Sequence, residues 1–233
     1  MMPGSARAGG APAPAAVPQT AVVRHLGIDD QSSTRVRAVD AALRCIARNG
    51  VQRTTVDDIA QEAGVSRVTL YRTFPGGRDA VLAAVVETEA ARLFSAVAVA
   101  MGDARDLEDV LVAGMVEAAR RLCRHQALSR VMAQEPGLVL SHLAFSQMDA
   151  VLRTSAELTA PFFARWLDPD QAARAAEWAT RILVSYLVCP GEGTRPIDLT
   201  HPDQARHLVG TFVIPGIQAL RMAAAEPDRG RER

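Results

Sequence analysis

The sequence predicts an all-α protein in which a small N-terminal unit of three helices precedes a larger helical bundle. Aromatic residues make up only 4% of the 233 residues, while hydrophobic residues make up 48%, with alanine, valine and leucine dominant. Such a composition favours closely packed helices over a sheet sandwich. Apolar residues also recur at helical spacing from residue 34 onward, and the sequence shows no alternating strand pattern of useful length.

The N-terminal segment has no helical period. Residues 1–30 are rich in glycine, alanine and proline, so we expect a disordered arm. An arm that contacts DNA is the alternative, although Arg7 and Arg24 are its only cations. The first helix is expected over residues 34–49, and it ends where Gly50 tolerates the left-handed conformation.

A short helix, a turn and a second short helix follow. Thr55 and Asp58 have the spacing of a capping box, which marks the start of the first of these helices. Gly64 ends it, and Ser66 is placed to cap the next helix, which runs to Phe74. Two short helices joined by a turn that contains glycine make a helix-turn-helix, whose second helix can enter the major groove of DNA.

The side chains of that second helix indicate which face is free to meet DNA. With Leu70 facing the core, a rotation of about 100° per residue points Val68 and Arg72 almost directly away. Thr69 and Tyr71 flank them. An exposed valine wastes apolar surface unless it contacts a group such as a thymine methyl. This face is therefore the candidate for base and phosphate contacts.

Longer helical patterns make up the rest of the chain. We expect helices over residues 79–101, 106–123, 125–134, 145–167, 170–189 and 201–224, and a disordered polar tail over 226–233. Apolar faces on the last two of these helices predict a dimer contact, and burial within the subunit is the alternative. The residues concerned are Ile182, Leu183, Tyr186, Leu187, Leu208, Phe212, Val213, Ile217 and Leu220.

The charge distribution separates two parts of the chain. The formal net charge is zero, with 26 basic and 26 acidic residues, and every basic residue is arginine. Residues 35–78 contain eight arginines and four acids, whereas residues 79–233 contain sixteen arginines and twenty acids. A basic head is thus balanced by an acidic body, as expected when one end meets DNA. The absence of lysine excludes Schiff-base lysine catalysis and the phosphate-binding lysine of P-loop proteins.

The segment TTVDDIAQEAGVSRVTLYRTF, residues 54–74, resembles the DNA-binding domain of the TetR family of transcriptional regulators. The resemblance covers about residues 34–82 and rests on the paired threonines, the D-I-A, A-G-V-S and T-L-Y steps and the final phenylalanine. By this match the DNA-contacting positions are Thr55, Ser66, Arg67, Val68, Thr69, Tyr71 and Arg72. Arg78 stands in for the phosphate-contacting lysine that family members usually carry at the start of the fourth helix.

The resemblance implies a homodimer that binds a palindromic double-stranded DNA operator, most often as a repressor that a small-molecule ligand releases. It also implies a DNA-binding domain, here residues 31–78, and a ligand-binding and dimerisation domain, here residues 79–225. Large or adaptable side chains in the second domain are candidates for a pocket that takes an apolar or amphipathic effector. They are Met115, Met132, Phe145, Met148, Phe162, Trp166 and Trp178.

Other function classes are the alternatives. A transcriptional activator or a global DNA-binding regulator would share the helix-turn-helix but lack ligand release. An all-helical enzyme is less favoured, because no nucleophile with a base partner can be identified. The histidines show no metal-ligand spacing and no cofactor loop is found, so we expect neither metal nor cofactor. Three widely spaced cysteines and the lack of a membrane-spanning apolar run predict a cytoplasmic protein that does not bind a membrane.

Overall fold

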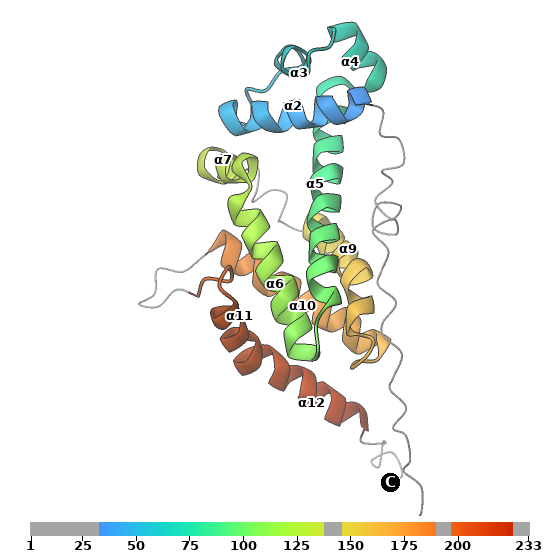
Figure 1. Cartoon of the computed structure of the whole chain (residues 1–233), viewed down its shortest axis with the longest axis vertical. Coiled ribbons are helices and arrows are strands. Elements are labelled where there is room, and N and C mark those ends of the chain that lie inside the picture. The colour runs from blue at the N-terminus through green and yellow to red at the C-terminus, as the bar shows by residue number, and fades with distance from the viewer. Residues whose placement is uncertain (1–32, 138–145, 190–196, 226–233) are drawn as a thin grey trace, which may run out of the picture.

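The computed structural model describes residues 33–137, 146–189 and 197–225, and within these ranges every regular element is a helix. The all-α class that the sequence predicts is confirmed. The predicted arm over residues 1–30 and the predicted tail over 226–233 lie outside the described residues. Figure 1 shows a small N-terminal group of helices at one end and a larger bundle at the other, with α5 (Gly77–Gly102) running from one to the other.

The ends of the N-terminal helices are set by the residues that the sequence predicts. Gly50, after the first helix, has a φ angle of 82°, and Gly64, after the second, has one of 65°. Thr55 Oγ1 accepts a hydrogen bond from Asp58 N at 3.2 Å, and Thr55 N donates to Asp58 Oδ2 at 3.0 Å, which completes the capping box. The helices of this group are α2 (Ser33–Asn49), α3 (Val56–Ala63) and α4 (Arg67–Thr73).

The bundle follows the predicted order of helices. No helix within the described ranges is both long enough and apolar enough to cross a membrane. After α5 come α6 (Leu107–Arg124), α7 (Gln126–Gln134), α9 (Ser146–Phe163), α10 (Pro169–Val188), α11 (Pro202–Leu208), the π-helical turn η1 (Val209–Val213) and α12 (Ile214–Ala225).

One predicted helix ends earlier than expected. The pattern over residues 145–167 predicts a single helix, but α9 ends at Phe163. Ala164 N and Trp166 N each donate to the carbonyl three residues earlier, at 3.4 and 2.9 Å, so the chain tightens into a turn here instead of continuing the α-helix. The turn returns the Leu167 side chain to the core, where it is 5% exposed. Leu167 therefore continues the apolar pattern because it is buried from a turn, although the helix does not extend to it.

The predicted helix over residues 201–224 is divided by the wider turn η1. Ile214 N donates to the Val209 carbonyl, five residues earlier, instead of the usual four. Pro215 follows at once, and because proline has no N–H, the Thr211 carbonyl lacks its α-helical donor. The widened turn thus lies where proline already interrupts the hydrogen-bond ladder.

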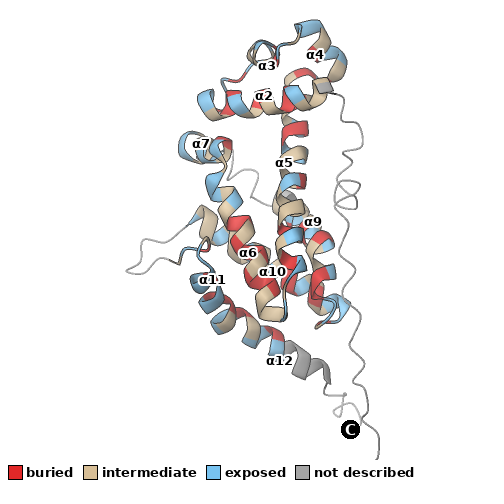
Figure 2. Cartoon of the chain, in the orientation of Figure 1, coloured by how far each residue is buried: buried red, intermediate tan, exposed pale blue. Residues whose placement is uncertain are grey.

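Two hydrophobic clusters lie toward the two ends of α5. The cluster in the N-terminal group includes buried Leu70 and Phe74 and takes Val81 from the beginning of α5. The larger cluster in the bundle takes Val97 and Met101 from the end of the same helix. Figure 2 shows buried residues in red along α5 and the helices around it. One continuous helix therefore belongs to both cores.

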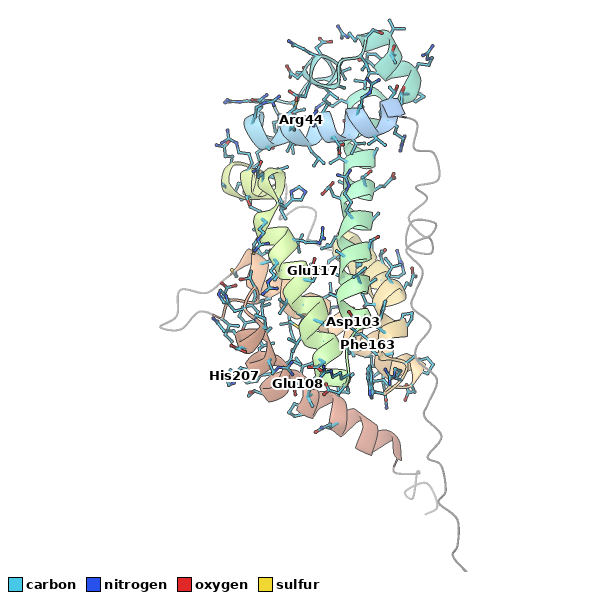
Figure 3. The ribbon with its side chains drawn as sticks, in the orientation of Figure 1. Arg44, Asp103, Glu108, Glu117, Phe163 and His207 are labelled. Atoms are coloured by element: carbon cyan, nitrogen blue, oxygen red, sulfur yellow. The ribbon has the colours of Figure 1, made fainter. Side chains whose placement is uncertain are left out.

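Ion pairs attach the C-terminal helices to α6. Arg206 of α11 contacts Glu108 at 3.0 Å and Asp109 at 2.6 Å. Figure 3 shows Glu108 at the foot of α6, beside the C-terminal helices. Higher on α6, Arg120 Nε donates to the Thr200 carbonyl at 2.8 Å. The segment before α11 and α11 itself are thus held against one face of the bundle.

Candidate nucleic-acid interface and apolar cavity

Helix α4 presents one face to the core and the other to solvent. Leu70 and Phe74 are 1% and 2% exposed, whereas Val68 is 77% exposed and Tyr71 is 44% exposed. Arg72 is also exposed. This is the orientation that counting residues around the helix predicts. The open face of α4 therefore carries an apolar group, an aromatic ring and a cation, which together suit the floor and walls of a major groove.

Hydroxyl groups fix the starts of α3 and α4. Ser66 Oγ accepts a hydrogen bond from Thr69 N at 3.1 Å and lies 2.8 Å from Thr69 Oγ1. Thr55 Oγ1 donates to Asp58 Oδ2 at 2.7 Å, and this hydrogen bond holds the pKa of the Asp58 carboxyl below its ordinary value. Three residues that the sequence assigns to DNA contacts therefore also set the ends of the two helices.

Arg67 lies between the two helices of the motif. Its Nε is 2.9 Å from Asp57 Oδ1, and both side chains are 62% exposed. The pair joins the first turn of α4 to the first turn of α3. Because an ion pair between exposed side chains is weak, Arg67 is able to exchange this partner for a phosphate or a guanine edge.

Arg78 is held by the backbone of the preceding loop. Its Nε donates to the Thr54 carbonyl at 2.8 Å, and its Nη2 donates to the Val51 carbonyl at 2.5 Å. Its Nη1 lies 3.7 Å from Asp79 Oδ1. The guanidinium thus fastens the start of α5 to the loop that leads into α3. The family resemblance places Arg78 at a phosphate, and the sequence gives no sign of these two backbone contacts.

Tyr71 packs against the turn between α4 and α5. Gly77 has a φ angle of 60°, which favours glycine. A Cβ atom at Gly77 would also lie 3.0 Å from Tyr71 Cε1, so the absence of a side chain lets the ring approach the backbone. The position of Tyr71 on the interface therefore depends on a glycine six residues further along the chain.

The N-terminal group leaves several cations in solvent. Glu62 neutralises Arg44 and Arg48, at 2.7 and 2.6 Å, and Figure 3 shows Arg44 on α2. The exposed arginines of this group that form no ion pair with any described residue are Arg37, Arg53 and Arg72. Of these three, the motif match gives only Arg72, although the local excess of arginine is a signal that could have indicated the others.

A cavity of about 260 Å³ lies in the bundle among α5, α6, α7, α9 and α10. Its lining is almost entirely apolar and includes Met115 and Met132 from the predicted set, together with Phe163. Figure 3 labels Phe163 at the end of α9. The other predicted side chains that the structure describes lie outside this lining: Met148, Phe162, Trp166 and Trp178. Phe145 lies outside the described residues.

Helix α7 connects the cavity to the N-terminal group. Its residues Leu128 and Met132 line the cavity, and the same helix packs against α2. Just after α7, both carboxylate oxygens of Glu135 accept from Gln52 N at 3.3 Å. A Cβ atom at Gly50 would overlap the Glu135 carboxylate, so a side chain there would make that carboxylate shift. The helix that supplies Leu128 and Met132 to the cavity is therefore followed directly by a residue that contacts the loop before α3.

A chain of polar contacts runs beside α7. His125 Nδ1 accepts from Leu128 N at 3.0 Å, so neutral His125 carries its proton on Nε2 and donates it to Glu89 Oε2 at 2.9 Å. Glu89 Oε1 in turn accepts from Arg92 at 2.7 Å, and Arg92 reaches Asp40 of α2 at 3.0 Å. The hydrogen bond from His125 is the main cause that lowers the pKa of Glu89 below its ordinary value.

Comparisons with known proteins agree with the helix-turn-helix geometry. Residues 38–85 match the family model of the bacterial regulatory proteins of the tetR family. The HTH-type transcriptional regulator Mb2274c of Mycobacterium bovis is 33% identical over 133 residues, which cover 56% of this chain and 68% of that protein. The chain belongs to the TetR family. A second relative, the HTH-type transcriptional regulator Rv1255c of Mycobacterium tuberculosis, is 28% identical over 194 residues, 81% of this chain and 87% of that protein.

Solved structures share the TetR fold over most of the chain. The TetR family repressor AlkX from Dietzia sp. superposes with a TM-score of 0.58 and 24% identity, covering 79% of this chain and 95% of that one. The fatty acid degradation regulator FadR from Bacillus halodurans gives a TM-score of 0.55 and 19% identity, covering 79% and 98%. TetR-family regulators bind DNA, act as dimers and are not enzymes. The chain is accordingly a DNA-binding transcriptional regulator.

Proposed function

We propose that this TetR-family protein is a homodimeric repressor that binds a palindromic operator and is released from it by a small apolar molecule. Residues 31–78 act as the DNA-binding domain and residues 79–225 as the ligand-binding and dimerisation domain, with α5 shared between their cores. The protein works in the cytoplasm, where bacterial DNA lies. The alternative of an activator differs in its effect on transcription and not in this architecture.

The observation that carries the proposal is the double role of α7. Leu128 and Met132 on this helix line the cavity, while the helix packs on α2 and Glu135 beyond its end holds the Gln52 amide. A ligand that favours a different position of α7 therefore also favours a different position of α2 and of the loop before α3. Release follows because the ligand binds more tightly to the form in which the two α4 helices no longer match successive major grooves.

In the proposed complex α4 enters the major groove. Val68 contacts a thymine methyl, and Arg67 and Arg72 pair with guanine edges or phosphates. Arg53 adds a phosphate contact from the loop before α3, because it is exposed and has no ion partner among the described residues. Arg78 acts mainly by holding that loop. The remaining DNA-contacting positions carry hydroxyl groups, which contact phosphates or base edges: Thr55, Ser66, Thr69 and Tyr71.

The dimer is proposed to form through α10 and the C-terminal helices. Trp178 on α10 is 61% exposed and Phe212 in η1 is 69% exposed, which leaves two large apolar side chains in solvent. Other residues predicted for this contact serve the subunit itself: Leu183 and Leu187 line the cavity, and Leu208, Val213 and Ile217 are buried. Ile182 and Tyr186 pack against the core, and the Leu220 side chain lies outside the described residues.

The DNA-binding face is tested by two substitutions. We expect Arg67→Ala and Tyr71→Ala each to abolish the mobility shift of an operator fragment, because each removes an exposed side chain of α4. The fragment is one that the wild-type protein selects from random DNA. Helix content and oligomeric state, measured by circular dichroism and light scattering, should not change.

Arg105→Ala is the matched control, since it removes an exposed arginine from the loop between α5 and α6, far from α4. A mobility shift that both test variants leave unchanged would refute the assigned face. A transcription reporter that carries the same operator separates the two directions of regulation, because a repressor lowers and an activator raises its output.

A further inference from the structure

The cavity that the proposed function assigns to an effector has a lining without charge. Among the described residues that line it, no aspartate, glutamate, arginine or histidine is present. An ionised ligand would leave water without gaining a counter-charge, and burying an unpaired charge is costly. The described lining therefore favours a neutral molecule. The polar residues of this lining are Ser155, Thr159 and Thr180, and each carries a hydroxyl.

The three hydroxyl protons already have acceptors inside the protein. Thr159 Oγ1 donates to the Ser155 carbonyl at 2.7 Å, and Thr180 Oγ1 donates to the Ala176 carbonyl at 2.9 Å. Ser155 Oγ lies 2.6 Å from Thr180 Oγ1. Either hydroxyl could donate across this contact, and we assign its proton to Ser155, because the single proton of Thr180 has the Ala176 carbonyl as its acceptor.

This arrangement leaves the hydroxyl oxygens with lone pairs and no free proton. A hydroxyl oxygen accepts up to two hydrogen bonds, so Ser155 Oγ keeps its full accepting capacity. A ligand hydroxyl is able to donate to it without disturbing any internal bond. A ligand carbonyl, ether or carboxylate oxygen finds no donor there unless one of the internal bonds breaks. Ser155 is 5% exposed, so water does not readily supply the missing donor.

We propose that the cavity binds a neutral, mainly apolar molecule that carries one hydrogen-bond donor, namely an aliphatic alcohol, in preference to the corresponding ether or carboxylate. The alkyl chain occupies the apolar space among α5, α6 and α7. The hydroxyl donates to Ser155 Oγ on α9, beside Thr180 of α10. This proposal rests on the proposed function only in that the cavity is the effector site, and it concerns binding and not DNA release.

The test measures direct binding of three probes to the full-length protein by isothermal titration calorimetry. Decanol carries a donor, methyl nonyl ether has nearly the same shape and only accepts, and decanoate is ionised at neutral pH. We expect decanol to bind about tenfold more tightly than the ether, the ratio that one additional buried hydrogen bond produces. Decanoate is expected to bind more weakly than both.

Two variants locate the effect. Ser155→Ala removes the acceptor and should abolish the difference between decanol and the ether. Thr180→Val keeps the side-chain shape but frees the Ser155 proton to point at the ligand, so the ether should gain affinity relative to decanol. Thr154→Val is the matched control, because it removes a hydroxyl from the neighbouring position of α9 that does not line the cavity. It should leave all three affinities unchanged.

Three outcomes would overturn the proposal: decanoate or the ether binding more tightly than decanol, no binding of decanol, or an unchanged decanol-to-ether ratio in both Ser155→Ala and Thr180→Val. The proposed function fails in a different way. If decanol binds as expected but leaves the affinity for the operator unchanged, the result supports the proposed ligand class and refutes the proposed release of DNA by the ligand.

Discussion

Arg78 joins two segments that lie more than twenty positions apart in the sequence. Its guanidinium donates to the carbonyls of Val51 and Thr54, so it closes the loop between α2 and α3 onto the start of α5. The planar fork of a guanidinium suits two acceptors at once, whereas an ammonium group presents a single charged centre. Thr55, which follows this loop, begins α3. Arg78 therefore supports the interface from within the protein.

Replacing Arg78 with lysine should keep the positive charge but lose the planar guanidinium that donates to two carbonyls at once. We expect Arg78→Lys to lower the free energy of unfolding by about 2 kcal/mol, since hydrogen bonds to a charged group contribute on the order of 1.5–3 kcal/mol. Urea denaturation measures this change, and Arg105→Lys is the control on an exposed arginine. Affinity for the operator, measured where both proteins are folded, should fall less than tenfold. A larger loss of affinity with unchanged stability would instead assign Arg78 to direct phosphate contact.

Gly77 should be sensitive to substitution for two separable reasons. Gly77→Ala forces a side chain into the left-handed region, which costs about 1–2 kcal/mol, and also pushes the ring of Tyr71 away from the α4–α5 turn. Gly64→Ala is the matched control, because Gly64 has a similar φ angle but no atom within 4 Å of an added Cβ. Thermal unfolding should show a loss in both variants. Operator affinity should fall beyond that loss in Gly77→Ala alone, and equal affinities would remove the role given to the ring.

Whether a feature of a single residue can be predicted from the sequence depends on how far along the chain its contacts reach. The capping box at Thr55, the cap at Ser66 and the left-handed Gly64 depend on neighbours within a few positions, so the sequence pattern suffices to predict them. The carbonyl contacts of Arg78 and the approach of Tyr71 to Gly77 depend on where α5 leaves the N-terminal group. No local pattern records that direction, so only the folded chain shows them.

At the scale of helices, the contacts of Glu89 link the corner between α6 and α7 to α2. We expect the Glu89 pairing to stabilise the protein above the ordinary glutamate pKa of 4.5. Because the folded pKa lies lower than that value, the stabilisation is lost as the pH falls through the lowered pKa. Glu89→Gln should therefore be less stable than the wild type near neutral pH, and the gap should narrow below about pH 4.5.

Chemical denaturation at a series of pH values measures that gap. The groups that face Glu89 are His125, Arg92 and, through Arg92, Asp40. Glu117→Gln serves as the control, because Glu117 forms an ion pair with Arg121 on the exposed face of α6. A gap that stays constant from neutral to acidic pH would show that the carboxylate charge of Glu89 is not what stabilises this corner.

Helix order and most helix ends are predictable because apolar periodicity and capping residues extend over many positions. The exceptions are instructive. Leu167 continues the apolar pattern of α9 but is buried from a turn, and the Pro215 region keeps the pattern of one long helix while the backbone widens into η1. Apolar periodicity indicates which residues are buried, but it does not indicate whether the backbone at those residues is an α-helix, a turn or a wider π-helical turn. The cavity is harder still, because its lining is drawn from five helices whose packing no single pattern encodes.

At the scale of the whole molecule, the zero net charge is the sum of two unlike parts. The segment over residues 35–78 has four more arginines than acids, and the segment over residues 79–233 has four fewer. Figure 1 shows the first segment at one end of the molecule and most of the bundle toward the other, with α5 running between them. An acidic bundle is repelled by DNA while the basic end is attracted, which orients the protein with α4 toward the groove.

Because each subunit carries one α4 at the end of its bundle, we expect DNA affinity to depend on dimerisation through the bundles. We expect Trp178→Arg and Phe212→Arg to convert the dimer into a monomer, because each places a charge among apolar side chains that the partner would cover. A monomer contacts one half-site, so operator affinity should fall by more than tenfold while helix content remains. Light scattering and mobility shift measure the two effects. Val99→Arg is the control, since Val99 is also an exposed apolar residue, at 58%, and lies on α5. Variants at Trp178 and Phe212 that remain dimeric would place the interface on another face of the bundle.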